Sequence, residues 1–485
     1  MVASPTPWIA CLAFLSLTVL FFSARELGGT LSPQGCRMSW MSPSYVQQID
    51  FNTSWSPLAD RYSLWLYREV GWDAARVGDS LPVLFVPGNA GSSHQVRSIA
   101  SSATRQYFSS PLRISPEFSA RSNVYKPLDF YAVEFNEDLS AFHGTTLESQ
   151  IDYTSKAVAY ILSLYPPNTQ IIVLGHSMGG VVATSLLPSR EISAVITMST
   201  PFTLPPARFD NNIDSIYANI ARVLENNSTP IVSLCGGATD MMIPSESCIL
   251  PPNSRSLFRR TVFSSALEGA WTGVGHREMV WCHQVRWRVA RAALELAPFA
   301  SEDKRVEVLD RWLRDGHTLP SLDMDSVKPL DEHEAEHAII LPVGQKLVVD
   351  GPKGTRAHLL PIPAARKRFT LLVSGGAVLS LAPEHHLPFS VAVYQCSGQF
   401  HCTPFRPDTL KLLPTPAPKK PFPVPHEGSD ESEGVVLLEA QLDGLSEDTT
   451  HLAVKIEQGD GRGWVIADFA DEHDEVNEPA STTCK

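Results

Sequence analysis

The feature that most constrains this chain is the pentapeptide GHSMG at 175–179, which has the pattern G-x-S-x-G. The run before it, 170–174, is apolar and β-branched, which predicts a short buried strand. The run after it, 180–187, is rich in small residues and stops at Pro188, which predicts a helix. This motif between a strand and a helix is typical of a nucleophile elbow, a strained turn that exposes a serine hydroxyl. We therefore predict that Ser177 is a catalytic nucleophile.

Strands and helices are expected to alternate around the motif. Parallel strands of such proteins are covered by helices on both faces, and ligands bind at their carboxyl ends. Because Asn89, Ser177, Asp240 and His276 each follow an expected strand, we expect them to converge at one edge of the sheet. The strands are expected at 81–86, 128–135, 170–174, 194–198, 231–234 and 262–263, and the helices at 94–103, 147–164, 180–187 and 278–296.

An activated serine needs a histidine base and a carboxylate that orients the base. Behind a nucleophile elbow these follow the serine in the order acid, then histidine. Asp240 comes after a glycine turn that follows the strand at 231–234, and His276 lies on a glycine-flanked loop before a helix. We predict that Asp240 is the acid and His276 the base. The alternatives are Asp210, Asp214 and Glu246 for the acid and His283 for the base.

The oxyanion hole is expected to use two backbone amides. One is that of Met178, directly after the nucleophile. The other is that of Asn89 or Ala90, in the glycine-containing loop after the first strand, and the sequence does not choose between them. His176 fills the variable position of the motif and is expected to be structural. His94 and His143 are minor candidates for contact with a substrate.

The N-terminus carries one apolar segment, at 8–22, followed by Arg25. It is long for the core of a signal peptide and short for a membrane span of about 20 residues. We expect residues 1–25 to be an uncleaved signal anchor, with a cleaved signal peptide as the alternative. Either leads to a translocated protein, in which three asparagines stand in N-glycosylation motifs, namely Asn52, Asn226 and Asn227.

Charge and cysteine content narrow the class of protein. The net charge is −13 and no long basic block occurs, which argues against a nucleic-acid partner. Among eight cysteines, the short loops 235–248 and 396–402 are closed by cysteines suited to disulfides in an oxidising compartment. The sequence does not assign Cys36, Cys282 or Cys484 to a partner.

The C-terminal part has a different character. A helix at 301–314 opens a helix and polar linker assigned to 301–336, and short alternating runs separated by Gly and Pro follow. Such runs predict a β-sandwich or jelly-roll-like domain at 337–485, with a Pro-rich loop at 414–433. The segment HEAEH at 333–337 matches the zinc pattern H-E-x-x-H. We interpret it as part of the charged linker, and we expect no metal and no cofactor.

Several motifs together resemble the GPI inositol-deacylases. These are CRMSWMSPSY, RYSLWLYRE, FVPGNAGSSHQVRSIA, LGHSMGG, GGATDMMIPSE and GHREMVWCHQ, and the resemblance covers 36–296. It implies an α/β-hydrolase fold for 26–300, with a mostly parallel sheet and helices on both faces. It also implies hydrolysis of the acyl ester on the inositol of GPI anchors, at Ser177, Asp240 and His276.

By the same resemblance, the substrates are GPI lipid and GPI-anchored proteins, whose export and quality control this step supports. The location is the endoplasmic reticulum membrane, with the catalytic domain in the lumen. Two features depart from the family: Gly275 replaces an aspartate before the histidine, and the family's C-terminal membrane spans are not in this sequence. The alternatives are a general lumenal or secreted lipase with a lid at 201–224, and a non-catalytic hydrolase-fold binding module.

Overall fold

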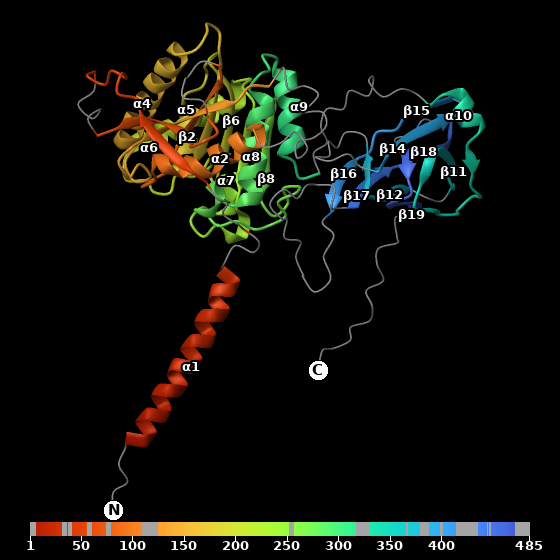
Figure 1. The fold of residues 1–485 in the computed structure, drawn as a ribbon, viewed down its shortest axis with the longest axis horizontal. Coiled ribbons are helices and arrows are strands. Elements are labelled where there is room, and N and C mark those ends of the chain that lie inside the picture. Colours follow the sequence, from red (N-terminus) through yellow and green to blue (C-terminus); the bar gives the residue numbers. More distant parts are fainter. Residues whose placement is uncertain are drawn as a thin grey trace, which may run out of the picture.

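The structure of the chain is a computed structural model. It describes residues 6–31, 36, 41–55, 61–73, 79–108, 125–251, 257–316, 330–364, 367–378, 388–397, 401–413, 435–443, 445 and 448–470. The first element, α1 (Thr6–Leu31), stands apart from the rest of the molecule in Figure 1. Its segment Trp8–Arg25 has a mean hydropathy of 1.8 and no buried part, so it is long and apolar enough to cross a membrane.

An eight-stranded sheet forms the core of the larger domain (Figure 1). Its strand order is β1-β2-β4-β3-β5-β6-β7-β8; β1 and β2 pair antiparallel, and β2 pairs antiparallel with β4. From β4 to β8 all neighbours are parallel, which is the arrangement of the α/β-hydrolase fold. The bounds are β1 Pro43–Gln47, β2 Ser63–Glu69, β3 Leu81–Val86, β4 Leu128–Glu134, β5 Ile171–His176, β6 Ile192–Met198, β7 Ile231–Cys235 and β8 Arg259–Phe263.

Two hydrophobic cores lie on opposite faces of this sheet. Successive strand residues point to alternate faces, so in β3 Val83 and Phe85 join one core while Leu84 and Val86 join the other. Helices α2, α8 and α9 cover the first face, and α4, α5 and α6 cover the second. Their bounds are α2 Arg97–Phe108, α4 Gly144–Ser163, α5 Met178–Ser185, α6 Asn211–Asn226, α8 His283–Leu296 and α9 Glu302–Trp312.

The predicted mostly parallel sheet is confirmed, but its antiparallel edge was missed. The first strand expected from the sequence begins at residue 81, whereas β1 and β2 come before it. Their residues are mostly half-buried or polar, so neither strand is a continuous apolar run.

The lid expected at 201–224 is wrong over its helical part, because α6 packs Ile213 and Ile220 into the core beside α4 and α5.

The smaller domain is the expected β-sandwich. Its sheets have the orders β10-β19-β12-β17-β16 and β13-β14-β18-β11-β9, with β15 paired to β14, and they enclose a common core. Strands β11, β15 and β16 were missed, since they are short or carry charges and glycine. The bounds are β9 Ile339–Ile340, β10 Leu347–Asp350, β11 Lys353–Pro361, β12 Arg368–Ser374, β13 Gly376–Val378, β14 Phe389–Ser397, β15 His401–Pro404, β16 Thr409–Leu413, β17 Val435–Gln441, β18 Thr449–Asp460 and β19 Trp464–Ala470.

The segment HEAEH is helical rather than an irregular linker. It lies on α10 (Glu332–Glu336) and its end, with Asp331 capping the helix and the rings of His333 and His337 stacked at 4.3 Å. Glu334 forms an ion pair with Lys455 at 2.8 Å. The expectation that no metal binds here stays a prediction. The Pro-rich loop at 414–433 lies outside the described residues.

Three disulfides form. The two predicted pairs, Cys235–Cys248 and Cys396–Cys402, are confirmed. The third, Cys36–Cys282, joins residues 246 positions apart and ties the chain after α1 to the start of α8. Cys11 is free and exposed on α1, and Cys484 lies outside the described residues.

Candidate active site

Ser177 sits in a strained turn between β5 and α5. Its φ is 53° and its ψ is −126°, a conformation that residues other than glycine rarely adopt. Neighbouring glycines make room for the turn: a β-carbon on Gly179 would lie 2.1 Å from the carbonyl oxygen of Val86, and one on Gly88 would lie 2.6 Å from the Ser177 Cβ. The local geometry is therefore that of the nucleophile elbow expected from the sequence.

Hydrogen bonds from the neighbouring strand end hold the elbow in place. The Ser177 N–H donates to the Met198 carbonyl at 2.8 Å, and the hydroxyl of Thr200 donates to the Ser177 carbonyl at 3.0 Å. Ser177 is 6% exposed. Its hydroxyl makes no hydrogen bond with any residue that the structure describes, and such contacts often tighten only when substrate is bound. The backbone of the elbow is fixed while the hydroxyl stays available.

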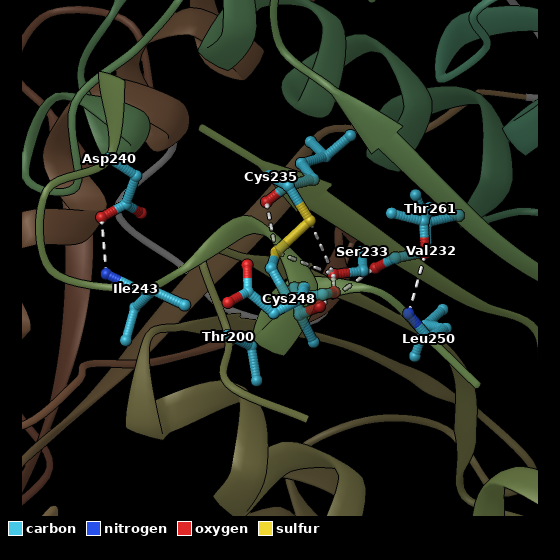
Figure 2. The surroundings of a disulfide bond; sticks show 12 residues. Thr200, Val232, Ser233, Cys235, Asp240, Ile243, Cys248, Leu250 and Thr261 are labelled. Atoms are coloured by element: carbon cyan, nitrogen blue, oxygen red, sulfur yellow. Dashed lines mark hydrogen bonds between the residues drawn. A yellow bond between two sulfur atoms is a disulfide. The ribbon is translucent and has the colours of Figure 1, made fainter. Parts of the chain in front are cut away.

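Asp240 lies in a loop that the Cys235–Cys248 disulfide closes (Figure 2). Its Oδ1 accepts hydrogen bonds from the N–H groups of Met242 at 3.0 Å and Ile243 at 2.9 Å. A β-carbon on Gly236 would lie 2.3 Å from the Val274 carbonyl oxygen, so this glycine permits close approach to the loop that carries His276. The backbone and the disulfide together fix the carboxylate.

His276 and Asp240 are directly hydrogen-bonded. The His276 Nδ1 lies 3.0 Å from the Asp240 Oδ2, and both side chains are more than nine-tenths buried. Burial by itself would raise the pKa of Asp240, but the hydrogen bond and charge of His276 and the Ile243 amide hold it below its usual value. Asp240 is thus an anion that fixes Nδ1 as the protonated nitrogen of His276 and leaves Nε2 free to accept a proton.

The side chain of His176 contacts the backbone of His276. Its Nε2 lies 2.9 Å from the His276 carbonyl oxygen, and the two imidazole rings are 4.9 Å apart. Burial, helped by the charge of His276, lowers the pKa of His176 to about 4, so the ring is neutral and its Nε2–H donates to that carbonyl. From the sequence, His176 is expected to be a structural residue. Its contact with His276, one hundred positions away, carried no signal in the sequence.

The backbone amides near Ser177 differ in their availability. Met178 is the first residue of α5, so its N–H has no partner within the helix. The Ala90 N–H donates to the Asp138 carbonyl at 3.2 Å, while the Asn89 N–H has no acceptor among the described residues. The Asn89 side chain accepts from the Ala141 N–H at 2.9 Å, which holds this loop. The geometry favours Asn89 over Ala90 as the second donor.

The side chains considered as alternative acids and as the alternative base lie in other surroundings. Asp210 caps α6 through the amides of residues 212 and 213, Asp214 pairs with Arg208 on the surface, and Glu246 is exposed on the short helix α7 (Ser245–Cys248). His283 begins α8 and contacts Arg286. The minor candidates for substrate contact also lie on other elements: the His94 ring packs edge-on against Tyr45, and His143 precedes α4.

Large apolar side chains are exposed on loops at the carboxyl edge of the sheet. They follow β4, β6 and β7, and Met241 and Phe209 are 84% and 72% exposed. The rings of Phe142 and Phe209 stack at 6.1 Å, which joins two of the loops. We call this set the apolar rim, and it consists of Leu139, Phe142, Leu204, Phe209, Met241 and Met242.

The expected glycosylation asparagines are all at the surface or close to it. Asn52 and Asn226 are exposed, the first in the loop after β1 and the second at the end of α6. Asn227 is half-buried, and its side chain accepts a hydrogen bond from the Thr229 N–H at 2.9 Å. Glycosylation at these positions stays a prediction.

Comparisons with known proteins agree with this geometry. The family model of the PGAP1-like alpha/beta domain matches residues 78–296. A GPI inositol-deacylase of Neurospora crassa is 32% identical over 544 residues, covering 96% of this chain, and one of Cryptococcus neoformans is 34% identical over 469 residues, covering 91%. Most of this chain is thus similar to GPI inositol-deacylases, and residues 78–296 match the PGAP1-like alpha/beta domain.

The chain spans about half the length of the curated GPI inositol-deacylases it matches, 42% of the Neurospora protein and 53% of the Cryptococcus protein. Solved structures are more distant. A ferulic acid esterase aligns with 54% of this chain and 98% of its own at 13% identity, with a TM-score of 0.34. The fold assignment therefore rests on the strand order and the elbow.

Proposed function

We propose that this chain is a serine ester hydrolase that removes the acyl chain from the inositol of GPI anchors. The observation that carries the proposal is the Asp240–His276 hydrogen bond, together with the contact of His276 with His176, the residue before the strained Ser177. The chain is similar to GPI inositol-deacylases over most of its length. Its substrates are GPI lipid and GPI-anchored proteins, and its action supports their export and quality control.

In the first half of the reaction, the acyl ester is transferred to the enzyme. The Ser177 oxygen attacks the ester carbonyl carbon while His276 Nε2 takes the hydroxyl proton, and Asp240 stabilises the resulting imidazolium. The amides of Met178 and Asn89 donate to the developing oxyanion. The C–O bond to inositol then breaks, and His276 returns the proton to the departing inositol oxygen.

In the second half, water regenerates the enzyme. His276 removes a proton from the water as its oxygen attacks the acyl-serine carbonyl, and the same amides hold the oxyanion. Collapse of this intermediate breaks the bond to Ser177, which regains its proton from His276. One ester and one water give one fatty acid and one inositol hydroxyl, so atoms and charge balance.

The apolar rim supports a lipid ester as the substrate. Exposed apolar side chains that gather on a protein commonly contact membranes or apolar ligands, and the loops that carry these ones follow strands of the sheet edge at which Ser177 lies. The N-terminal helix, the three disulfides and the N-glycosylation motifs support a membrane-anchored protein in an oxidising compartment. We place the catalytic domain in the lumen of the endoplasmic reticulum.

The decisive experiment compares the full chain with Ser177→Ala on acyl-inositol GPI and on soluble short-chain esters. We expect release of fatty acid from acyl-inositol GPI to fall to background in Ser177→Ala, together with labelling by a fluorophosphonate probe. Ser185→Ala, on the same helix, is the matched control and should keep both. Equal activity on all esters would favour a general lipase, and folded wild-type protein that the probe does not label would contradict the proposal.

A further inference from the structure

The β-sandwich contains a hollow far along the chain from the candidate active site. Its volume is about 390 Å³, at the lower end of the range of small-molecule sites. It lies where the chain crosses from β10 in one sheet to β11 in the other, and Ile456 of β18 contributes a wall. The lining residues are Val348, Val349, Asp350, Gly351, Pro352, Lys353, Gly354, Arg356, His358 and Ile456.

The register of β11 places polar residues where the sandwich core would continue. Arg356 pairs with Ile456 and His358 with Val454, and both partners belong to the core between the sheets. Two positions further, Leu360 of β11 belongs to the same core. Because alternate strand residues share a face, Arg356 and His358 lie on the inner face of their sheet. Arg356 is exposed at the end of this face, whereas His358 is buried where an apolar residue would satisfy packing, so the histidine needs another explanation.

His358 is the buried member of the pair. It is 8% exposed, and its Nδ1 is buried with no hydrogen-bond partner among the described residues, an arrangement that costs free energy in a folded protein. Burial and the nearby charge of Arg356 lower the pKa of His358, so the ring is neutral and one of its nitrogens carries a proton that it can donate.

Within the part of the chain that the structure describes, the cations beside the hollow also lack ion-pair partners. Neither Lys353 nor Arg356 has a carboxylate within ion-pair distance among the described residues, and Asp350, which shares the lining, pairs with neither. Some other basic side chains of this domain do form ion pairs: Lys346 with Asp468 at 2.8 Å and Arg462 with Asp460. In a chain of net charge −13, two unpaired cations around one hollow favour an anion.

We propose that this hollow binds a phosphate ester, with Lys353, Arg356 and His358 as the side chains that recognise it. Two charged donors and one neutral donor match the several acceptor oxygens of a phosphate. Gly351 and Gly354 line the hollow without side chains, and a β-carbon on Gly354 would meet nothing within 4 Å, so the backbone is open to a ligand. The volume suits a phosphorylated sugar or polyol. The phosphate belongs either to a glycan or polyol headgroup or to free inorganic phosphate.

The test is isothermal titration calorimetry of the full chain in an uncharged detergent, in the Ser177→Ala background so that turnover cannot interfere. The probes are inorganic phosphate, mannose 6-phosphate and glycerophosphoinositol, with mannose as the uncharged control. We expect saturable binding of the phosphorylated probes, weakened at least 10-fold by Arg356→Gln and by Lys353→Gln. Lys346→Gln removes the same charge from the same domain and should change Kd less than 2-fold.

The probes also distinguish the two sources of the phosphate. Tighter binding of either ester than of inorganic phosphate assigns the site to a glycan or polyol headgroup, whereas equal binding of all three assigns it to free phosphate. Arg356→Gln and Lys353→Gln are surface substitutions, and unchanged thermal unfolding checks that both variants fold. The absence of saturable binding, or equal binding by wild type and Arg356→Gln, would overturn the proposal. Because binding needs no hydrolysis, this result is independent of whether the proposed reaction occurs.

Discussion

At the scale of single residues, the least expected contact is that between the two histidines. His176 ends β5 directly before Ser177, the proposed nucleophile, and its Nε2–H donates to the carbonyl of His276, the proposed base. A shift of the strand end would therefore move Ser177 and His276 together. We infer that His176 is a positioning residue, which acts on the reaction through His276.

His176 should make the hydrolase domain sensitive to acid. Its pKa falls from 6.5 in the unfolded chain to about 4 when folded, so its contribution is fully present above pH 6.5 and is lost as the pH falls towards 4. A shift of this size corresponds to about 3 kcal/mol. Measured by urea unfolding at a series of pH values, the free energy of unfolding of His176→Leu should lack the fall between pH 6.5 and 4 that His176 causes in the wild type.

His176→Asn, which keeps a hydrogen-bond donor, should retain a higher kcat than His176→Leu. Equal kcat values for the two variants would argue against a positioning role for His176.

Asp240→Asn should lower kcat by about 10³–10⁴-fold with little change in KM, because the amide no longer fixes the tautomer of His276. The pKa of Asp240 is lowered on folding, so the ionised carboxylate stabilises the fold above pH about 4 and this contribution is lost as the pH falls further. Asp214→Asn, which disrupts an exposed ion pair, is the control. It should change neither kcat nor the loss of unfolding free energy that accompanies a fall in pH below about 4. Comparable kcat values for both variants would exclude Asp240 as the acid.

At the scale of elements, the loop after β7 carries Asp240, the proposed catalytic acid, and is closed by the Cys235–Cys248 disulfide. The disulfide that closes it is separated from Asp240 by a few residues on either side, and Ser233 of β7 donates to the Cys248 carbonyl at 2.8 Å (Figure 2). The loop also carries Met241 and Met242 of the apolar rim. A single short segment thus positions the carboxylate and presents apolar side chains.

Removal of this disulfide should affect both stability and catalysis. Closing a loop of this length stabilises a fold by about 3 kcal/mol. We expect the double variant Cys235→Ala, Cys248→Ala to unfold at lower urea concentration and to lose about 10-fold or more in kcat, because Asp240 becomes mobile. The matched control is Cys396→Ala, Cys402→Ala, which opens a short loop in the β-sandwich and should leave kcat unchanged. If both pairs behave alike in kcat, the clamp has no role in positioning.

The apolar rim should matter for esters in membranes and not for soluble ones. We expect the double variant Met241→Ser, Met242→Ser to lower the rate on acyl esters in lipid vesicles about 100-fold or more and to leave hydrolysis of a soluble short-chain ester within 2-fold, since burying each such side chain contributes about 1.5–3 kcal/mol. Val70→Ser, 60% exposed after β2 at the opposite edge, is the control. Equal losses on both substrates would place these methionines in the catalytic geometry instead.

At the scale of the whole molecule, buried charges couple the two domains. Glu268 of the hydrolase domain pairs with Arg314 at 2.9 Å and accepts the Leu412 N–H of β16 at 2.9 Å. Arg314 donates to the Leu410 carbonyl of the same strand. Trp271 packs against the core of the sandwich. The β-sandwich is therefore fixed to the hydrolase domain by contacts that exclude water.

Glu268→Gln should uncouple the domains. The substitution leaves the Arg314 charge buried without its counter-ion, which costs about 3–5 kcal/mol. In differential scanning calorimetry we expect the two domains of Glu268→Gln to unfold in two separate transitions. The transitions of the wild type should lie closer together in temperature. Asp460→Asn breaks an exposed pair with Arg462 and should shift neither transition by more than a degree or two. A Glu268→Gln profile identical to wild type would show that other contacts join the domains.

Much of the hydrolase domain was predictable because its signals are local. The buried strands β3 and β5 are continuous apolar runs, and the elbow is a pattern of five adjacent residues. Strands at the sheet edge and in the sandwich were harder, because a half-buried strand such as β2 mixes polar and apolar residues. In β11 the glycine and charges that concealed the strand are the residues that line the hollow.

The sequence by itself determined the elbow, the order of Ser177, Asp240 and His276, and two short-range disulfides, since each depends on residue types at close or ordered spacing. Only the tertiary structure decided the Cys36–Cys282 bond, the support of His276 by His176 and the preference for Asn89 over Ala90. Those contacts join segments that the strand order brings together from distant positions. No local pattern of residues encodes which distant carbonyl or sulfur a side chain will meet.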